Sequence, residues 1–107
     1  MSKFFESEVV QGELLRMQEL YLDINKMGLL LTAPQKKIQL DKMMELINLQ
    51  QTMYMRVTLS DDPQARALVE QVKSAATMLG MPPSDISPRF YDKLKENVQK
   101  MIDQLPN

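Results

Sequence analysis

The sequence predicts an all-α protein with the architecture of a four-helix bundle: two long helices, a shorter third and a C-terminal fourth. Three observations support this prediction. Apolar residues recur at helical spacing, prolines stand at the ends of the periodic segments, and only three glycines occur in 107 residues. The abundant Met, Leu, Lys, Gln and Glu residues lose little rotamer freedom in a helix. We therefore expect residues 1–107 to form a single helical domain.

The first helix is expected from about Ser7 to about Gly28. Ser7 is a suitable N-cap, because its hydroxyl can accept a hydrogen bond from a free N–H of the first turn. The residues on one face then follow at alternating spacings of four and three, which is the period of a helix. They are Val10, Leu14, Met17, Tyr21, Ile24 and Gly28.

The second helix is expected from about Ala33 to about Leu59. Thr32-Ala33-Pro34-Gln35 has the pattern of a capping box, with proline in the first turn, where its missing N–H has no cost. No further glycine or proline occurs before Pro63, so the helix can be long. Its main apolar face comprises Leu40, Met43, Met44, Ile47 and Tyr54.

A second apolar flank of this helix is the predicted self-association surface. It comprises Leu46, Leu49, Met53 and Val57. A chain this small cannot easily cover more than half of a long helix, so we expect this flank to pair with a second copy. The ten methionines of the chain fit either core filling or an adaptable surface that binds another protein. Both interpretations stay open.

The last two helices are predicted from turn residues. The third begins at Ser60-Asp61-Asp62-Pro63 and ends at Gly80, where a left-handed residue is expected. A loop covers residues 81–87, and the fourth helix runs from about Ser87, or a few residues earlier, to about Leu105. The sequence leaves open whether the short third helix aligns with the long pair or crosses it.

The composition argues against several classes of function. The chain has no cysteine and no histidine, so it lacks thiolates, disulfides, the commonest general base and the commonest transition-metal ligand. The adjacent Asp61 and Asp62 are interpreted as helix caps, and the sequence contains no glycine-rich phosphate loop. We predict no catalytic residue, no metal site and no cofactor, and hence a protein that is not an enzyme.

The charges indicate few electrostatic partners. Thirteen basic and 14 acidic residues give a net charge of −1, which provides little attraction to nucleic acid or anionic membranes. Four lysines surround the turn between the first and second helices: Lys26, Lys36, Lys37 and Lys42. We interpret them as keeping this turn solvated, with weak contact to phosphate groups as the alternative. The sequence shows neither a membrane-spanning run nor a signal-peptide core, which predicts a cytoplasmic protein without membrane contact.

Three segments together resemble a known family. They are Phe4-Phe5-x-Ser7-Glu8-x-Val10, Gln51-x-Met53-Tyr54-x-Arg56 and Leu59-Ser60-Asp61-Asp62-Pro63. The chain is similar to small, uncharacterised all-helical proteins of cyanobacteria and of the large tailed phages that infect them. The resemblance implies a helical fold and a phage or cyanobacterial origin, with the host cytoplasm as the location if a phage encodes the protein. It carries over no activity, cofactor or catalytic residue.

The leading prediction is therefore a non-enzymatic protein that self-associates and acts as a phage or cyanobacterial accessory factor. The first alternative is a module that binds a host or phage protein through a methionine-rich helical surface. The second is a factor that binds nucleic acid weakly through the lysines around the turn between the first and second helices. The mass of the protein in solution separates the leading prediction from both alternatives.

Overall fold

The computed structural model describes residues 3–78 and 88–106, and it confirms the all-α prediction. Within these residues the helices are α1 (Lys3–Glu6), α2 (Glu8–Met27), α3 (Ala33–Leu59), α4 (Pro63–Met78) and α5 (Pro88–Asp103). The single turn α1 precedes the predicted first helix, whose start at Ser7 is otherwise correct. The predicted stop at Gly80 and the predicted loop lie outside the described residues.

The two long helices begin and end where the cap residues predict. The N–H of Val10 donates to Ser7 Oγ at 3.5 Å. Thr32 and Gln35 form the predicted capping box: the N–H of Thr32 donates to Gln35 Oε1 at 3.0 Å, and the N–H of Gln35 donates to Thr32 Oγ1 at 3.3 Å. Gly28 follows α2 with a φ of 74° and a ψ of −154°, a backbone conformation that glycine adopts far more readily than other residues. Short-range chemistry therefore sets these boundaries.

Asp62 joins the N-terminus of the chain to the start of α4. Its Oδ1 accepts a hydrogen bond from the N–H of Gln64 at 2.9 Å, and its Oδ2 accepts one from the N–H of Phe4 at 3.2 Å. The N–H of Asp62 donates to Ser60 Oγ at 3.0 Å. One carboxylate thus caps two helices, which confirms its interpretation as a cap.

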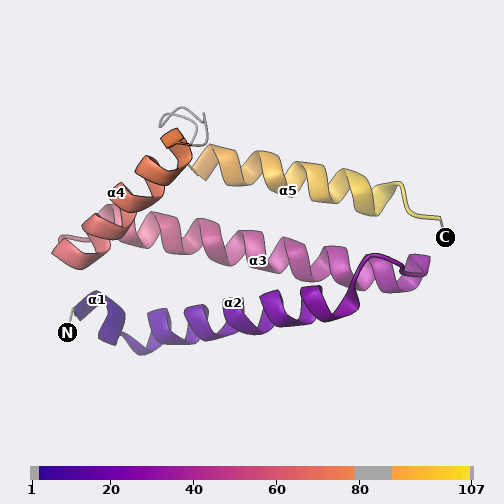
Figure 1. The fold of residues 1–107 in the computed structure, drawn as a ribbon, viewed down its shortest axis with the longest axis horizontal. Coiled ribbons are helices and arrows are strands. Elements are labelled where there is room, and N and C mark those ends of the chain that lie inside the picture. The colour runs from indigo at the N-terminus through magenta and orange to yellow at the C-terminus, as the bar shows by residue number, and fades with distance from the viewer. Residues whose placement is uncertain (1–2, 79–87, 107) are drawn as a thin grey trace.

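The α3 helix is the middle member of a flat layer, with α2 on one side and α5 on the other (Figure 1). The α4 helix runs across one end of this layer. The molecule measures 48 × 32 × 19 Å, and its radius of gyration is 15.7 Å, against about 13 Å for a compact chain of this length. The predicted bundle is therefore approximate, because three helices are aligned and α4, the predicted shorter third helix, crosses one end of them.

Two buried clusters follow the length of α3. The first joins α2, α3 and α4, and α1 packs against it: Val10, Met53, Val57, Ala65 and Val69, with Phe4 and Phe5 alongside. The second joins α3 and α5: Leu40, Ile47 and Val98, with Met43, Met44, Tyr91, Leu94, Ile102 and Leu105 alongside. Leu20 of α2 and Leu46 of α3 are also buried. Because α3 contributes to both clusters, it is the structural axis of the chain.

Candidate protein-interaction surface

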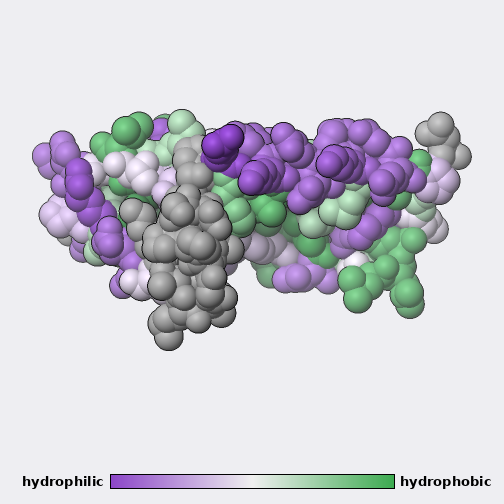
Figure 2. All heavy atoms as spheres, turned by 90° about the horizontal axis from the view of Figure 1, so that it is seen from above, coloured by the Kyte–Doolittle hydropathy of each residue, from purple (hydrophilic) through white to green (hydrophobic). Residues whose placement is uncertain are grey.

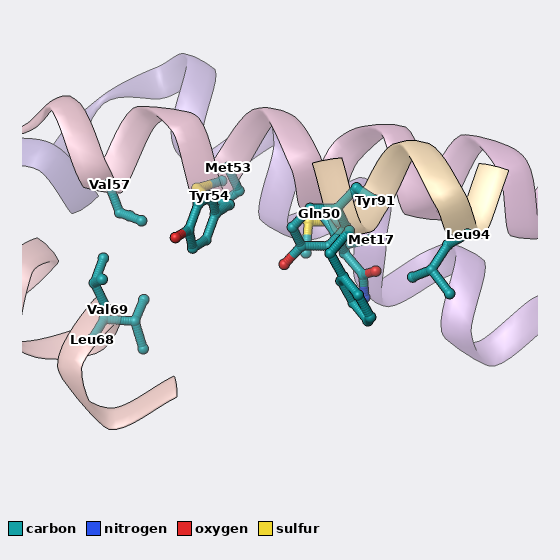
Figure 3. Close-up of a pocket in the computed structure, with 10 residues that line it drawn as sticks. Met17, Gln50, Met53, Tyr54, Val57, Leu68, Val69, Tyr91 and Leu94 are labelled. Carbon is teal, nitrogen blue, oxygen red and sulfur yellow. The ribbon is translucent and has the colours of Figure 1, made fainter. Parts of the chain in front are cut away.

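An apolar groove opens beside the C-terminal half of α3, near α4 (Figure 3). Its volume is about 290 Å³. The side chains that line it are apolar, aromatic or, in one case, an amide: Met17, Gln50, Met53, Tyr54, Val57, Leu68, Val69, Phe90, Tyr91 and Leu94. Burial raises the pKa of the Tyr91 hydroxyl above its usual value. This lining favours an apolar ligand group over acid–base chemistry.

Partly exposed apolar side chains extend the groove along α2 and α5. Leu14 and Tyr21 stand three residues before and four after Met17, so they share its side of α2. Met101 lies one heptad beyond Leu94 on α5 and is exposed as well. We call the groove together with Leu14, Tyr21 and Met101 the groove face.

On the side of the layer opposite the groove face, ion pairs bridge α2 and α3 along the line where the two helices meet, which we call the α2–α3 seam. Arg16 lies two residues from Leu14, about 200° around α2, and therefore points away from the groove face. Its guanidinium donates to both carboxylate oxygens of Glu45, at 2.6 and 2.9 Å, and holds the pKa of that carboxyl below its usual value. Lys42 and Asp23 pair across the same seam at 3.2 Å.

The α3–α5 seam has the same arrangement. Asp92 lies two residues from Leu94 and so occupies the opposite side of α5. Its carboxylate accepts a hydrogen bond from Gln51 at 2.9 Å, which lowers its pKa, and Lys95 donates to the Gln51 amide oxygen at 2.7 Å. We call the side of the layer with these contacts and the Arg16–Glu45 pair the ion-paired face.

The structure corrects the predicted position of the self-association surface. Leu46, Met53 and Val57 are buried within their own chain, with exposed fractions of 8%, 7% and 4%, and Leu49 is half-buried. The reason is that α2 and α4 both pack on this flank of α3. The exposed apolar residues of the groove face lie instead on α2, α4 and α5.

Sequence reasoning missed the groove face because its members come from four different helices. The periodicity of the first helix placed Leu14 and Tyr21 on one face, and the structure leaves both side chains partly exposed. The heptad spacing of Leu94 and Met101 was a usable signal. The spacing alone could not show whether another helix covers Leu94 and Met101 in the folded chain.

Three of the four lysines around the turn between α2 and α3 contact neighbouring side chains. Lys37 and Lys42 form ion pairs with aspartates at 2.7 and 3.2 Å, and Lys36 donates to the amide oxygen of Gln39 at 2.8 Å. Lys26 is exposed at the end of α2. These contacts reduce the positive charge available to a phosphate group, because the aspartates neutralise part of it.

The described residues contain neither a metal-binding cluster nor a membrane-spanning helix. Across residues 3–78 and 88–106, no group of three or more His, Cys, Asp or Glu side chains is arranged to hold a metal ion. No helix in the same part of the chain has the length and hydropathy that a membrane span requires. The groove face is therefore the strongest candidate site that the structure offers.

Comparison with known proteins gives a match to a family model. This model, described as a domain of unknown function (DUF1825), matches residues 2–105. No curated protein and no solved structure matches the chain. Because the match covers almost the whole sequence, the resemblance to an uncharacterised family is confirmed at that level. The chain belongs to the DUF1825 family.

Proposed function

We propose that this protein is a non-enzymatic interaction protein that self-associates through its groove face. The observation that carries the proposal is the uneven distribution of polar and apolar side chains over the two sides of the layer. On one side, polar side chains bridge both seams of α3. On the other side, the groove and the exposed side chains of Leu14, Tyr21 and Met101 are mainly apolar, and one hydrogen bond, from the Gln50 amide to the Tyr21 hydroxyl at 2.6 Å, joins α3 to α2 there. A mainly apolar surface of this kind is typical of an interaction site.

The accessible surface area supports an interface of ordinary size. The structure exposes 7542 Å², whereas surface scaling gives about 6,100 Å² for a compact monomer of this mass. The excess of about 1,400 Å² is larger than the roughly 800 Å² that each partner buries in a standard interface. A second copy can therefore cover the groove face and still leave an ordinary amount of surface exposed.

A second copy is the proposed occupant because the same apolar region faces it from the other chain. Closed dimers commonly place the same patch of both subunits in contact across a two-fold axis. Two layers stacked groove face to groove face would enclose a core between them, as facing helices do in a bundle. Each copy would then cover the side of α3 that its own chain leaves open.

A pair of substitutions at neighbouring positions tests this proposal. Leu14→Lys places a charge on the groove face, whereas Leu15→Lys adds the same charge at an exposed position on the outer side of α2. We expect Leu14→Lys to raise the dimer dissociation constant by at least about 100-fold, because a buried ammonium without a partner costs several kcal/mol. Leu15→Lys should leave it within about threefold, since surface substitutions change little.

The measurement is sedimentation velocity over a range of concentrations, with far-ultraviolet circular dichroism to verify that both variants stay folded. Equal effects of the two substitutions on association would contradict the proposed location of the interface. A folded Leu14→Lys protein that associates as tightly as the wild type would contradict it as well.

The first alternative is that the groove face binds a helix of a different protein. Met17 and Met101 favour this alternative, because methionine side chains adapt to differently shaped partners. In that case the wild-type protein is monomeric, and Leu14→Lys leaves its mass unchanged. The second alternative, weak nucleic-acid handling, is disfavoured by the ion pairs of Lys37 and Lys42.

We also propose a setting for this function, which rests on the sequence resemblance alone. The protein is proposed to be an accessory factor of cyanobacteria or their phages that acts in the cytoplasm of the cell. Immunodetection in fractionated cyanobacterial cells, with and without phage infection, tests this setting. Recovery of the protein in the cytoplasmic fraction is expected, and recovery only in membranes or released virions would contradict the proposal.

A further inference from the structure

The turn between α2 and α3 carries the most exposed large apolar side chains of the described residues. Leu29 is 90% exposed and Leu30 is 100% exposed. The turn lies at the end of the layer away from α4, and an apolar projection is visible at that end in the space-filling view (Figures 1 and 2). Single exposed leucines are ordinary, but two adjacent ones with almost no contact to their own chain need an explanation. We call Leu29 and Leu30 the leucine tip.

The two ends of this turn are anchored by hydrogen bonds. Gln39 is buried, with 5% of its surface exposed, and its amide donates to the carbonyl oxygens of Gly28 at 2.9 Å and Ile24 at 3.4 Å. Its own oxygen accepts a hydrogen bond from Lys36. On the other side, the capping box holds Thr32. The tip is thus presented by an ordered turn, which lowers the conformational entropy that binding would cost.

The turn and the groove lie along the same stripe of α3. Gln39, Gln50 and Val57 are separated by 11 and seven residues, which correspond to about three and two helical turns. Gln39 holds the turn, while Gln50 and Val57 line the groove. The rise of the helix separates Gln39 from Gln50, at the nearer end of the groove, by about 17 Å, and from Val57 by about 27 Å. A tip cannot reach the groove of its own chain across this rigid distance, so its partner must be another molecule.

The charges around the tip and around the groove are opposite. Residues 23–42, which flank the tip, contain four lysines and two aspartates, so their net charge is +2. At the other end of the layer, residues 61–70 contain three acidic residues and one arginine, and residues 3–19 contain four glutamates and two basic residues, although Glu13 also pairs with Arg56 of α3. This asymmetry favours an antiparallel pair, in which the basic end of one copy lies against the acidic end of the other.

We propose that the leucine tip of each copy inserts into the groove of its partner in an antiparallel dimer. This inference rests on the proposed self-association and names the segment that occupies the groove. Two-fold symmetry supplies the contact twice, once in each direction. The volume is sufficient, because a cavity about half as large as the 290 Å³ groove admits a benzene ring.

Cysteine cross-linking tests the contact directly, since the natural chain has no cysteine. Leu30→Cys protein is mixed with Leu68→Cys protein, which carries its thiol in the groove, and the mixture is equilibrated in a glutathione redox buffer. A disulfide needs Cα atoms within about 7 Å, so a mixed disulfide reports insertion of the tip. We expect the mixed dimer to exceed either symmetric disulfide at least fivefold. Leu15→Cys in place of Leu68→Cys should remove this excess.

A variant without the two leucines distinguishes a failure of tip insertion from a failure of self-association. The Leu29→Ser, Leu30→Ser double substitution should keep the circular dichroism of the wild type and raise the dimer dissociation constant at least 100-fold. A wild-type dimer whose dissociation constant does not change with this substitution, and which gives no mixed disulfide, overturns the insertion but leaves self-association intact. A monomeric wild type overturns both.

A vesicle assay addresses the other apolar environment that the tip could enter. Wild-type protein is mixed with vesicles of phosphatidylcholine and phosphatidylserine, and sedimentation measures the bound fraction. We expect no binding that depends on the leucines. Binding that disappears in the double variant, while the dimer is unaffected, would assign the tip to a lipid surface and overturn the proposal.

Discussion

The two sides of the α2–α3–α5 layer differ in how their seams are closed. On the ion-paired face, side chains such as Arg16 and Glu45 bridge neighbouring helices and remain partly hydrated. On the groove face, the same helices present apolar side chains that have no covering layer within the described residues. The layer is therefore amphipathic as a unit. Its ion-paired face is suited to water, whereas its groove face has the composition of a core.

The largest effect is expected where the groove meets the buried core. Met53 lines the groove but is 7% exposed, so Met53→Lys should lower the free energy of unfolding by about 3–5 kcal/mol, because a buried ammonium has no partner there. Met55→Lys, two residues along α3 at an exposed position, is the matched control and should change it by less than about 0.5 kcal/mol. Thermal unfolding followed by circular dichroism measures both. A folded Met53→Lys monomer of wild-type stability would show that this flank is an interface after all.

A smaller effect is expected from the buried amide that anchors the turn. Gln39→Ala removes the donor to the carbonyl oxygens of Gly28 and Ile24. We expect a loss of about 1–3 kcal/mol, since an unsatisfied buried carbonyl keeps its desolvation cost. Gln35→Ala, which removes one bond of an exposed capping box, should cost about 1 kcal/mol or less. Urea unfolding compares the two, and the reverse order would contradict a structural role for Gln39.

The loss of one ion pair from the ion-paired face should change the free energy of unfolding only slightly. Arg16→Ala removes the two hydrogen bonds to Glu45, but both side chains are more than two-fifths exposed. Exposed pairs of this kind contribute about 0–1 kcal/mol, so urea unfolding should show a loss within that range. A loss above about 2 kcal/mol would mean that the ion-paired face is as critical as the core.

The smallest effect is a dependence of stability on pH. Arg16 lowers the pKa of Glu45 in the folded state, so this contribution is present above the unfolded pKa of about 4.5 and is lost as the pH falls through the lower folded value. The raised pKa of Tyr91 acts in the opposite range, and its contribution is lost as the pH rises above about 10. Unfolding measured at pH 3, 7 and 11 tests both directions. Arg16→Ala should remove part of the acid dependence, and an unchanged acid dependence would contradict the assignment to Glu45.

The helix boundaries could be predicted because caps act within one turn. Each cap acts on backbone within a few residues of itself, and the structure contains three of them: Gly28 at the end of α2, Thr32 at the start of α3 and Asp62 at the start of α4. The same local chemistry could not show that Asp62 also caps α1, because that contact spans 58 residues. Long-range contacts leave no periodic signal in a single sequence.

The candidate site was harder to predict than the fold for the same reason. The helical period identified the apolar flank that contains Met53 and Val57, but it could not show which neighbour covers that flank. The crossing α4 covers it, and Ala65 and Val69 complete the cluster. The groove face depends on where α4 and α5 pack, so its position follows from the tertiary arrangement and not from any one helix.

Sedimentation equilibrium of the wild-type protein at tens of micromolar shows whether the chain self-associates. We expect a mass twice the chain mass of 12.4 kDa, with dissociation on dilution. The dimer should weaken with Leu14→Lys and persist with Leu15→Lys. A wild-type protein with the mass of one chain across this concentration range would contradict self-association through the groove face.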